Sequence, residues 1–139
     1  RLVGYENRLL NKEDFTDDKK DAEDLGAGHS VTVCYELKLK QNACEASAPS
    51  MSLAVRYKEP DSDTSKEQTY SFGTTHYTET PNDNFNFACA VIEMSMILHQ
   101  SEYISDINVE DIQKNLEKLD LSQDSYKSQF AQLVSKIAS

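Results

Sequence analysis

Apolar and polar residues alternate strictly along two segments in the first half of the chain. From Val31 to Lys40 the odd-numbered positions are apolar and the others mostly polar, and the pattern recurs from Ser52 to Lys58. A period of two is typical of a β-strand with one buried and one solvated face. We therefore expect one shared buried face, made by the odd-numbered apolar residues Val31, Val33, Tyr35, Leu37, Leu39, Leu53, Val55 and Tyr57.

Shorter apolar groups predict further strands around these two. Leu2 to Tyr5 has the composition of a short strand, and Tyr70 with Phe72 marks another. Residues 41–50 are rich in loop formers, and a turn runs from Pro60 to Lys66. Together the segments predict an antiparallel meander with one solvated face.

The periodicity changes after Gly73, where a long helix is expected. The sequence Thr80-Pro81-Asn82-Asp83 is typical of a helix start, because it offers a capping side chain and an acid in the first turn. From Phe85 to Leu98 the apolar residues surround the helix, with Ile92 near its middle. A helix that is apolar all round is buried all round, so we expect it to form the centre of the core.

Two more helices follow. Asn108 can cap the first, whose apolar residues Val109, Ile112, Leu116 and Leu119 recur at spacings of three and four. Ser122 or Asp124 can begin the second, which carries an apolar stripe of Tyr126, Phe130, Leu133, Val134 and Ile137.

Strands followed by helices predict an α+β fold. We expect one domain of 139 residues, with an antiparallel β-meander or half-sandwich over about residues 1–75 packed against about three helices over about residues 82–139. The chain opens in a strand-like segment, and Arg1 to Arg8 lacks the basic start and apolar stretch of a signal peptide. We therefore expect a fragment of a longer protein, whose targeting signals lie upstream.

Charge narrows the range of partners. The formal net charge is −10, which should repel phosphate backbones and anionic lipids, so nucleic acid and membrane surfaces are poor partners. The longest apolar run, Phe87 to Ile92, is far shorter than the roughly 18 residues that span a bilayer.

The three cysteines, Cys34, Cys44 and Cys89, contain no CxxC pair and predict neither a disulfide framework nor a zinc site. Cys34 lies in the middle of a predicted strand and Cys44 lies in the loop beyond its end. Six strand residues span roughly 20 Å, well above the ~7 Å Cα separation that a disulfide allows. Cys89 is expected to be a small core residue.

An acidic loop over residues 13–24 is the first candidate for a binding site. It holds seven carboxylates, and three lysines, Lys12, Lys19 and Lys20, lie beside or within it. Calcium prefers several oxygen ligands that converge from one short loop. The pattern of an EF-hand is absent, so a solvated, lysine-balanced loop is the preferred interpretation and a calcium-stabilised module the alternative. The candidate calcium ligands are Asp14, Asp17, Asp18 and Asp21.

Motifs of the common catalytic chemistries are not found. The sequence has no GxSxG, no HExxH and no phosphate loop, and His29, His76 and His99 lie far apart. Gly26-Ala27-Gly28 lacks the third glycine of a dinucleotide fingerprint and leads into a strand. We expect no catalytic, cofactor-binding or metal residues, although an enzyme with an unfamiliar site built from Glu36, His29 and nearby acids stays open as an alternative.

Several segments in fixed order resemble the C-terminal region of bacterial von Willebrand factor type A (vWA) domain proteins. The resemblance covers most of the chain, thins after Asp106, and is most specific over the first thirty residues. The segments are residues 1–8 (RLVGYENR), 11–15 (NKEDF), 17–22 (DDKKDA), 26–32 (GAGHSVT), 55–61 (VRYKEPD), 85–88 (FNFA) and 101–103 (SEY).

The resemblance implies a region without an assigned activity that follows a vWA domain in envelope-associated proteins, often lipoproteins. The metal-dependent adhesion site of such proteins belongs to the vWA domain, and its DxSxS signature is not carried over, because Asp61-Ser62-Asp63-Thr64-Ser65 fails at the middle position. Cys34 and Cys44 do not match the family pattern. The implied role is a non-catalytic interaction or scaffold module, whose partners are its own upstream vWA domain and an envelope protein.

Overall fold

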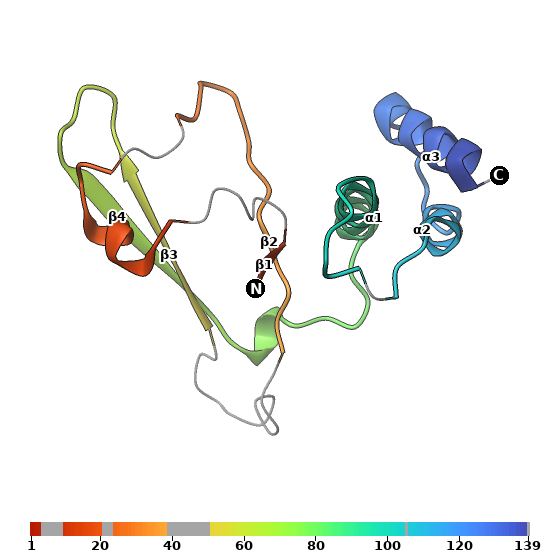
Figure 1. The fold of residues 1–139 in the computed structure, drawn as a ribbon, viewed down its shortest axis with the longest axis horizontal. Coiled ribbons are helices and arrows are strands. Elements are labelled where there is room, and N and C mark those ends of the chain that lie inside the picture. The colour runs from red at the N-terminus through yellow and green to blue at the C-terminus, as the bar shows by residue number, and fades with distance from the viewer. Residues whose placement is uncertain (4–9, 21–23, 39–50, 105, 139) are drawn as a thin grey trace. The chain divides into compact units, whose positions relative to one another are not determined.

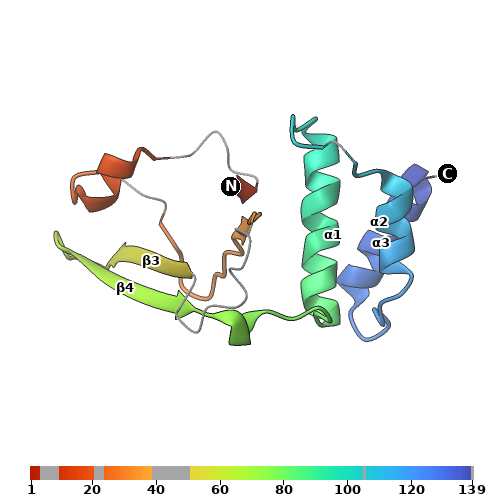
Figure 2. The ribbon, with the colours of Figure 1, turned by 90° about the horizontal axis from the view of Figure 1, so that it is seen from below.

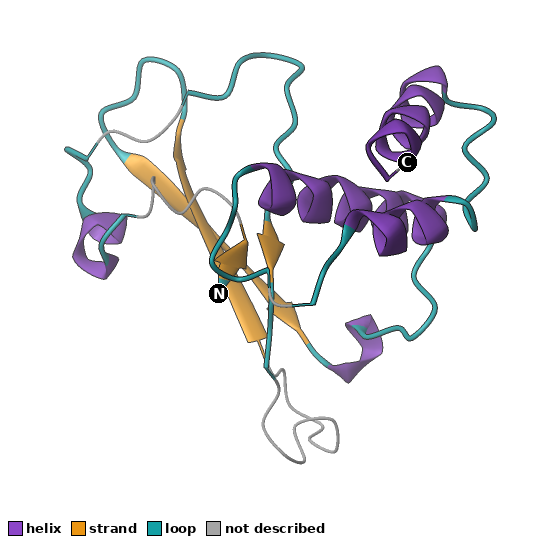
Figure 3. Cartoon of the chain, turned by 45° about the vertical axis from the view of Figure 1, so that its right-hand side comes forward, coloured by secondary structure: helices purple, strands orange, loops and turns teal. Residues whose placement is uncertain are grey.

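The computed structural model of the chain describes residues 1–3, 10–20, 24–38, 51–104 and 106–138. Strands fill the first part of the chain and three α-helices the second (Figures 1 and 3), so the predicted α+β class is confirmed. The chain divides into two compact units, Arg1–Thr78, here called the strand unit, and Glu79–Ser139, the helical unit.

The described residues of the strand unit contain two separate antiparallel pairs of strands. Strand β1 (Leu2–Val3) pairs with β2 (Cys34–Tyr35), and β3 (Met51–Lys58) pairs with β4 (Ser65–Phe72). In the second pair Met51 lies opposite Phe72 and Lys58 opposite Ser65. The strands predicted around residues 52–58 and 70–72 are therefore confirmed, but the described strands form two small sheets in place of one meander. Two short 3₁₀ helices, Lys12–Thr16 and Thr74–His76, also lie in the described part of this unit.

The predicted buried face was wrong for the described residues. Val31, Val33, Tyr35 and Leu37 are more than half exposed, and only Cys34–Tyr35 of residues 31–38 forms a strand. Leu39 and Lys40 lie outside the described residues. Alternation tells which side chains share a face, but a face is buried only where another element covers it. The two-residue strand β1 covers very little of this segment.

Strand β3 departs from the prediction in the same way. Leu53, Val55 and Tyr57 are exposed, whereas the half-buried residues are Ala54 and Arg56 on the opposite face. The polar face is the covered one because Phe15 and Asp18, from the segment before the hairpin, contact Arg56 on that face.

A tight turn connects β3 to β4. The amide of Ser62 donates to the carbonyl of Glu59 at 3.1 Å, and Asp61 has a φ of 63°. This is the arrangement in which proline is favoured at the second position, here Pro60, and a left-handed residue follows it. Aspartate tolerates that conformation better than most residues, so the predicted turn is confirmed with a specific geometry.

Each helix of the helical unit begins at a side chain that caps it. Asn82 accepts from the amide of Phe85 at 2.9 Å before α1 (Asp83–Leu98), and Asn108 accepts from that of Asp111 at 2.8 Å before α2 (Val109–Leu116). Asp124 accepts from the amides of residues 126 and 127 before α3 (Ser125–Ala138). The predicted helix starts are confirmed, with Asp124 as the start of the third.

The core of the described chain lies among these three helices. Ile112 on α2 and Val134 on α3 have no exposed surface, and the ring of Phe87 on α1 meets that of Phe130 edge to face at 5.4 Å. Figure 2 shows α1, α2 and α3 side by side. The core cluster consists of Ala90, Met94, Ile112, Leu116 and Val134.

Helix α1 is not buried on all sides, contrary to the prediction. Phe85 is 58% exposed and Leu98 is 67% exposed, although Ala90, Met94 and Met96 are buried. Within the helical unit α2 and α3 cover part of its circumference, and its apolar residues extend beyond that part. The expected packing of the strands on the helices stays a prediction. Among the described residues, no helix combines the length and apolar character that crossing a bilayer requires.

Candidate functional site

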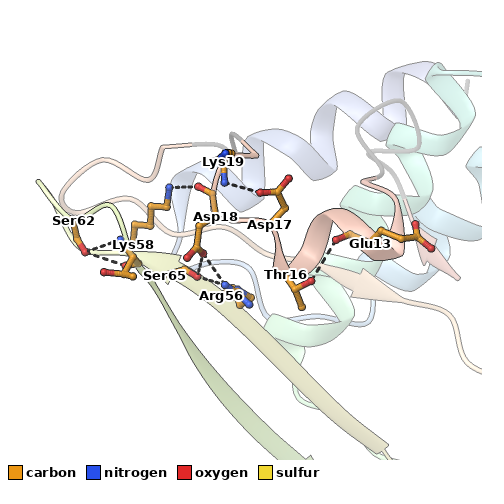
Figure 4. Close-up of polar contacts among 10 residues, drawn as sticks. Glu13, Thr16, Asp17, Asp18, Lys19, Arg56, Lys58, Ser62 and Ser65 are labelled. Carbon is orange, nitrogen blue, oxygen red and sulfur yellow. Dashed lines mark hydrogen bonds and ion pairs between the residues drawn. The ribbon is translucent and has the colours of Figure 1, made fainter.

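A polar cluster joins the acidic loop to the β3–β4 hairpin (Figure 4). Arg56 Nη2 donates to Asp18 Oδ1 at 2.7 Å and also to the hydroxyl of Ser65, which itself donates to the same carboxylate oxygen. Lys58 Nζ donates to the backbone carbonyl of Asp18 at 2.5 Å. We call these four residues, Asp18, Arg56, Lys58 and Ser65, the Asp18 cluster.

The strand register explains how three of its members come together. Arg56 and Lys58 are two residues apart on β3 and therefore project from the same face, and Ser65 begins β4 directly opposite Lys58. The 3₁₀ helix Lys12–Thr16 adds Phe15, whose ring centroid lies 5.9 Å from the guanidinium carbon of Arg56. The guanidinium is thus held by a carboxylate, a hydroxyl and an aromatic ring, a set of contacts that arginine makes better than lysine.

Hydrogen bonds and charge stabilise the ionised form of two carboxyl groups in this region. The hydroxyl of Ser65 and then the guanidinium of Arg56 lower the pKa of Asp18 below its usual value of 3.8. Desolvation raises the pKa of Asp14, but the ammonium of Lys20 and the donors of Asn11 outweigh it and lower the pKa overall. Both carboxylates are therefore charged and partnered at neutral pH.

The candidate calcium ligands are not gathered around one point where they are described. Asp14 lies 3.3 Å from Lys20 Nζ, Asp17 accepts from the amide of Lys19 at 2.9 Å, and Asp18 faces Arg56. Asp21 lies outside the described residues. Across the ranges that the structure describes, three or more His, Cys, Asp or Glu side chains never gather as a metal site would require. The calcium-stabilised module stays an untested alternative.

The Asp61–Ser65 segment serves as a turn. Ser62 Oγ donates to the carbonyl of Thr64 at 2.9 Å and accepts from its amide at 3.3 Å. Ser65, the last residue of the segment, takes no part in these bonds and donates to the carboxylate of Asp18. These bonds hold the loop closed on itself, which agrees with the turn interpretation.

The histidines have local partners. His76 Nδ1 accepts from the amide of Gly73 at 3.2 Å, and its ring meets Phe72 edge to face at 5.4 Å. His99 caps the end of α1, with its Nδ1 2.9 Å from the carbonyl of Ser95. Both histidines thus contact residues that are close to them in sequence.

The residues of the enzyme alternative are not brought together. His29 follows a turn in which its amide donates to the carbonyl of Gly26 at 3.1 Å and Gly28 has a φ of 80°, a conformation that favours glycine. The carboxylate of Glu36 instead pairs with the guanidinium of Arg1 at 2.5 Å. The Gly26-Ala27-Gly28 segment thus makes a turn and opens no helix.

Two cysteines lie in the described residues, Cys34 and Cys89, and both are partly buried. Cys44 lies outside them, so the expectation that it forms no disulfide stays a prediction.

Sequence reasoning did not anticipate the partners of Asp18. Arg56 and Lys58 were assigned to the solvated face of their strand, and Ser65 to a turn. A signal was present, because two cations at alternate positions on one strand face offer a docking point for an acidic segment. The pairing joins residues 38 positions apart, however, and alternation within a strand carries no information about such distant partners.

One further carboxyl group lies on the mostly apolar helix α1. Partial burial raises the pKa of Glu93, and no charge partner contributes to that shift. Among the described acids, Glu93 is the one whose pKa is raised, so its surroundings favour the neutral form.

The chain belongs to the family described as the C-terminal region of the uncharacterized protein YfbK, which matches residues 1–139. Uncharacterized protein YfbK of Escherichia coli (strain K12) is 31% identical over 132 residues, which cover 82% of this chain and 22% of that protein. The chain thus spans about a fifth of the length of this curated relative. No solved structure matches.

Proposed function

We propose that this region is a non-catalytic interaction or scaffold module within a longer bacterial protein. In this proposal it packs beside a vWA domain of the same protein, at the cell envelope, in a protein that is in many cases a lipoprotein. Two findings support the place of this region within a longer bacterial protein. The family is a C-terminal region, and the bacterial relative is several times longer than the chain. The vWA neighbour and the envelope location rest on the resemblance of the first thirty residues and of the later matching segments.

An exposed apolar sheet face is the observation that carries the proposal. Four alternate residues of β3 project from one face, each 38–42% exposed, and Tyr70 and Phe72 of β4 lie on the same face opposite two of them. The four β3 residues are Met51, Leu53, Val55 and Tyr57. A contiguous apolar patch is typical of an interaction site, whereas single exposed apolar residues are not.

The other face of the hairpin is already occupied. Arg56 and Ser65 bind Asp18 there, so the acidic loop lies against the polar face and leaves the apolar face to another partner. A two-stranded hairpin alone is only marginally stable in water, so covering this face would stabilise it as well as bind the partner. The Asp18 cluster would set the hairpin in position for that contact.

The expected partner surface is a protein. The net charge of −10 opposes phosphate and anionic lipid, while it does not oppose apolar contact with a neighbouring domain. The alternative enzyme gains no support from the described residues, since Glu36 pairs with Arg1 away from any contact with His29.

Side-chain footprinting of a full-length family member and of its isolated C-terminal region would test the proposal. We expect the positions equivalent to Tyr57 and Tyr70 to be labelled in the isolated region and protected in the full-length protein. Leu53→Lys should restore labelling in the full-length protein, whereas Leu25→Lys, at a position that is 64% exposed, should not. Equal labelling in the two proteins would contradict the contact.

Limited proteolysis tests whether the neighbouring domain and this region form one rigid unit. We expect slow cleavage before the position of Arg1 in the full-length protein. Fast cleavage there, with release of a stable fragment, would indicate a free linker and no fixed contact.

A further inference from the structure

Helix α3 carries a second apolar surface that the helical unit leaves exposed. Tyr126 is 83% exposed, Leu133 56% and Ile137 48%, and Phe130 lies between them and is only partly buried against Phe87. Residues at spacings of three and four lie on one face of a helix, so these four form one stripe. We call Tyr126, Phe130, Leu133 and Ile137 the α3 stripe.

We propose that the α3 stripe is the contact surface of a homodimer, in which α3 of one copy packs antiparallel to α3 of a second copy. The stripe has spacings of four, three and four residues, a pattern that reads the same in both directions. In an antiparallel pair related by a twofold axis, Tyr126 therefore lies opposite Ile137 of the second copy, and Phe130 opposite Leu133. A twofold interface requires this kind of self-complementary surface.

The charges of α3 favour the same occupant. The helix contains no Asp or Glu between Ser125 and Ala138, although the chain has 24 acids and a net charge of −10. Repulsion between acidic copies is therefore low along this helix. Lys127 pairs with Asp124 of its own chain at 3.9 Å and lies near Lys136 of the second copy in this register, while the antiparallel arrangement brings opposite helix-dipole ends together.

The size of the stripe sets the strength of the expected association. Stable interfaces bury at least about 1,000 Å² in total, and four side chains from each copy lie near or below that lower limit. The dimer should therefore be weak and depend on concentration. The inference does not depend on the proposed contact with a neighbouring domain, because that contact uses β3–β4.

Sedimentation velocity of the 139-residue chain over a wide concentration range is the first test. We expect the average mass to rise from one chain toward two, and to rise further at high salt, since salt screens repulsion between acidic copies while apolar contact persists. A mass of one chain at every concentration would overturn the proposal.

A matched pair of variants tests which surface is used. Leu133→Lys should abolish the concentration dependence, whereas Leu98→Lys should leave it unchanged, because Leu98 is a similarly exposed leucine on α1 outside the stripe. Circular dichroism should show equal helix content in both variants, since neither residue is buried. A Leu133→Lys variant that still dimerises would show that another surface is responsible.

Disulfide trapping tests the antiparallel register. In a background with the three native cysteines replaced by serine, a mixture of Tyr126→Cys and Ile137→Cys chains should form the mixed disulfide in preference to either homodisulfide. Preferential formation of the homodisulfides would indicate parallel helices and contradict the proposal.

Discussion

Arg56 illustrates how the contacts of one charged residue can decide which face of a strand is buried. Its side chain lies on the face that alternation assigns to solvent, yet its contacts with Asp18, Ser65 and Phe15 make it half-buried. The apolar residues on the other face stay exposed. Which face of a strand is covered thus depends on where the connecting segments lie, and a charged residue with several partners can fix such a segment in place.

The pH dependence of the Asp18 contact follows from the direction of its pKa shift. The pKa in the folded chain is below 3.8, so the contact stabilises the folded form above that value and is lost as the pH falls through the lower folded pKa. Asp18→Asn should therefore increase amide hydrogen exchange of residues 12–20 near neutral pH. The difference in protection against exchange between Asp18→Asn and the parent chain should be constant above about pH 5 and disappear in strong acid.

The control for this experiment is Asp63→Asn, because Asp63 is an exposed turn residue. Equal exchange in the parent chain and Asp18→Asn near neutral pH would show that the cluster does not hold the loop.

Thermal stability measures directly whether the acidic loop binds calcium in the folded chain. Asp14, Asp17 and Asp18 each have a local donor or cation, so we expect no cation to be needed for folding. Thermal melts with millimolar calcium and with a chelator should agree. A melting temperature several degrees higher with calcium would support the calcium-stabilised alternative, because a ligand that binds only the folded state stabilises it.

Among the elements, the helices could be predicted more completely than the strands. Asn82, Asn108 and Asp124 mark helix starts because a cap acts on amides two or three residues away, so the signal is local in sequence. The stripe of α2 is likewise local and forms part of the core.

The arrangement of the strands could not be predicted in the same way. The pairing of β1 with β2 joins residues more than thirty positions apart, and neither segment alone specifies its partner. Alternation from Val31 to Lys40 predicts a long strand, but within the described residues 31–38 only Cys34–Tyr35, which find a partner, form one. The Asp18 cluster was missed for the same reason, because its acid and its cations are distant in sequence.

The two isoleucines on neighbouring helices provide a matched test of where the core lies. The sequence places Ile92 in the centre of the core, whereas the structure leaves it half-buried and buries Ile112 completely. Ile112→Ala should lower the free energy of unfolding by about 2–5 kcal/mol, because it leaves a cavity among packed helices. Ile92→Ala should cost less, and chemical denaturation of both variants would compare them. A larger loss for Ile92→Ala would indicate that α1 has a partner on its other side.

At the scale of the whole molecule, burial is distributed unevenly between the two units. Every buried apolar residue among the described ranges, from Ala90 to Val134, belongs to the helical unit. The described part of the strand unit instead relies on two small sheets, the Asp18 cluster and the pair of Arg1 with Glu36. Since burial of apolar surface is the main source of stability, most of the stability of the described chain should reside in the helices.

Separate expression of the two units tests this expectation. Residues 79–139 should fold alone into three helices, because their caps and core contacts are all internal to that segment. Residues 1–78 should lose the dispersed amide spectrum of the β3–β4 hairpin, because isolated two-stranded hairpins are only marginally stable. Circular dichroism and two-dimensional NMR of both fragments, with Val134→Ala as a destabilised control for the helical one, would decide. An unfolded 79–139 fragment would show that the helices depend on the strand half, and would place the main source of stability in a contact between the units.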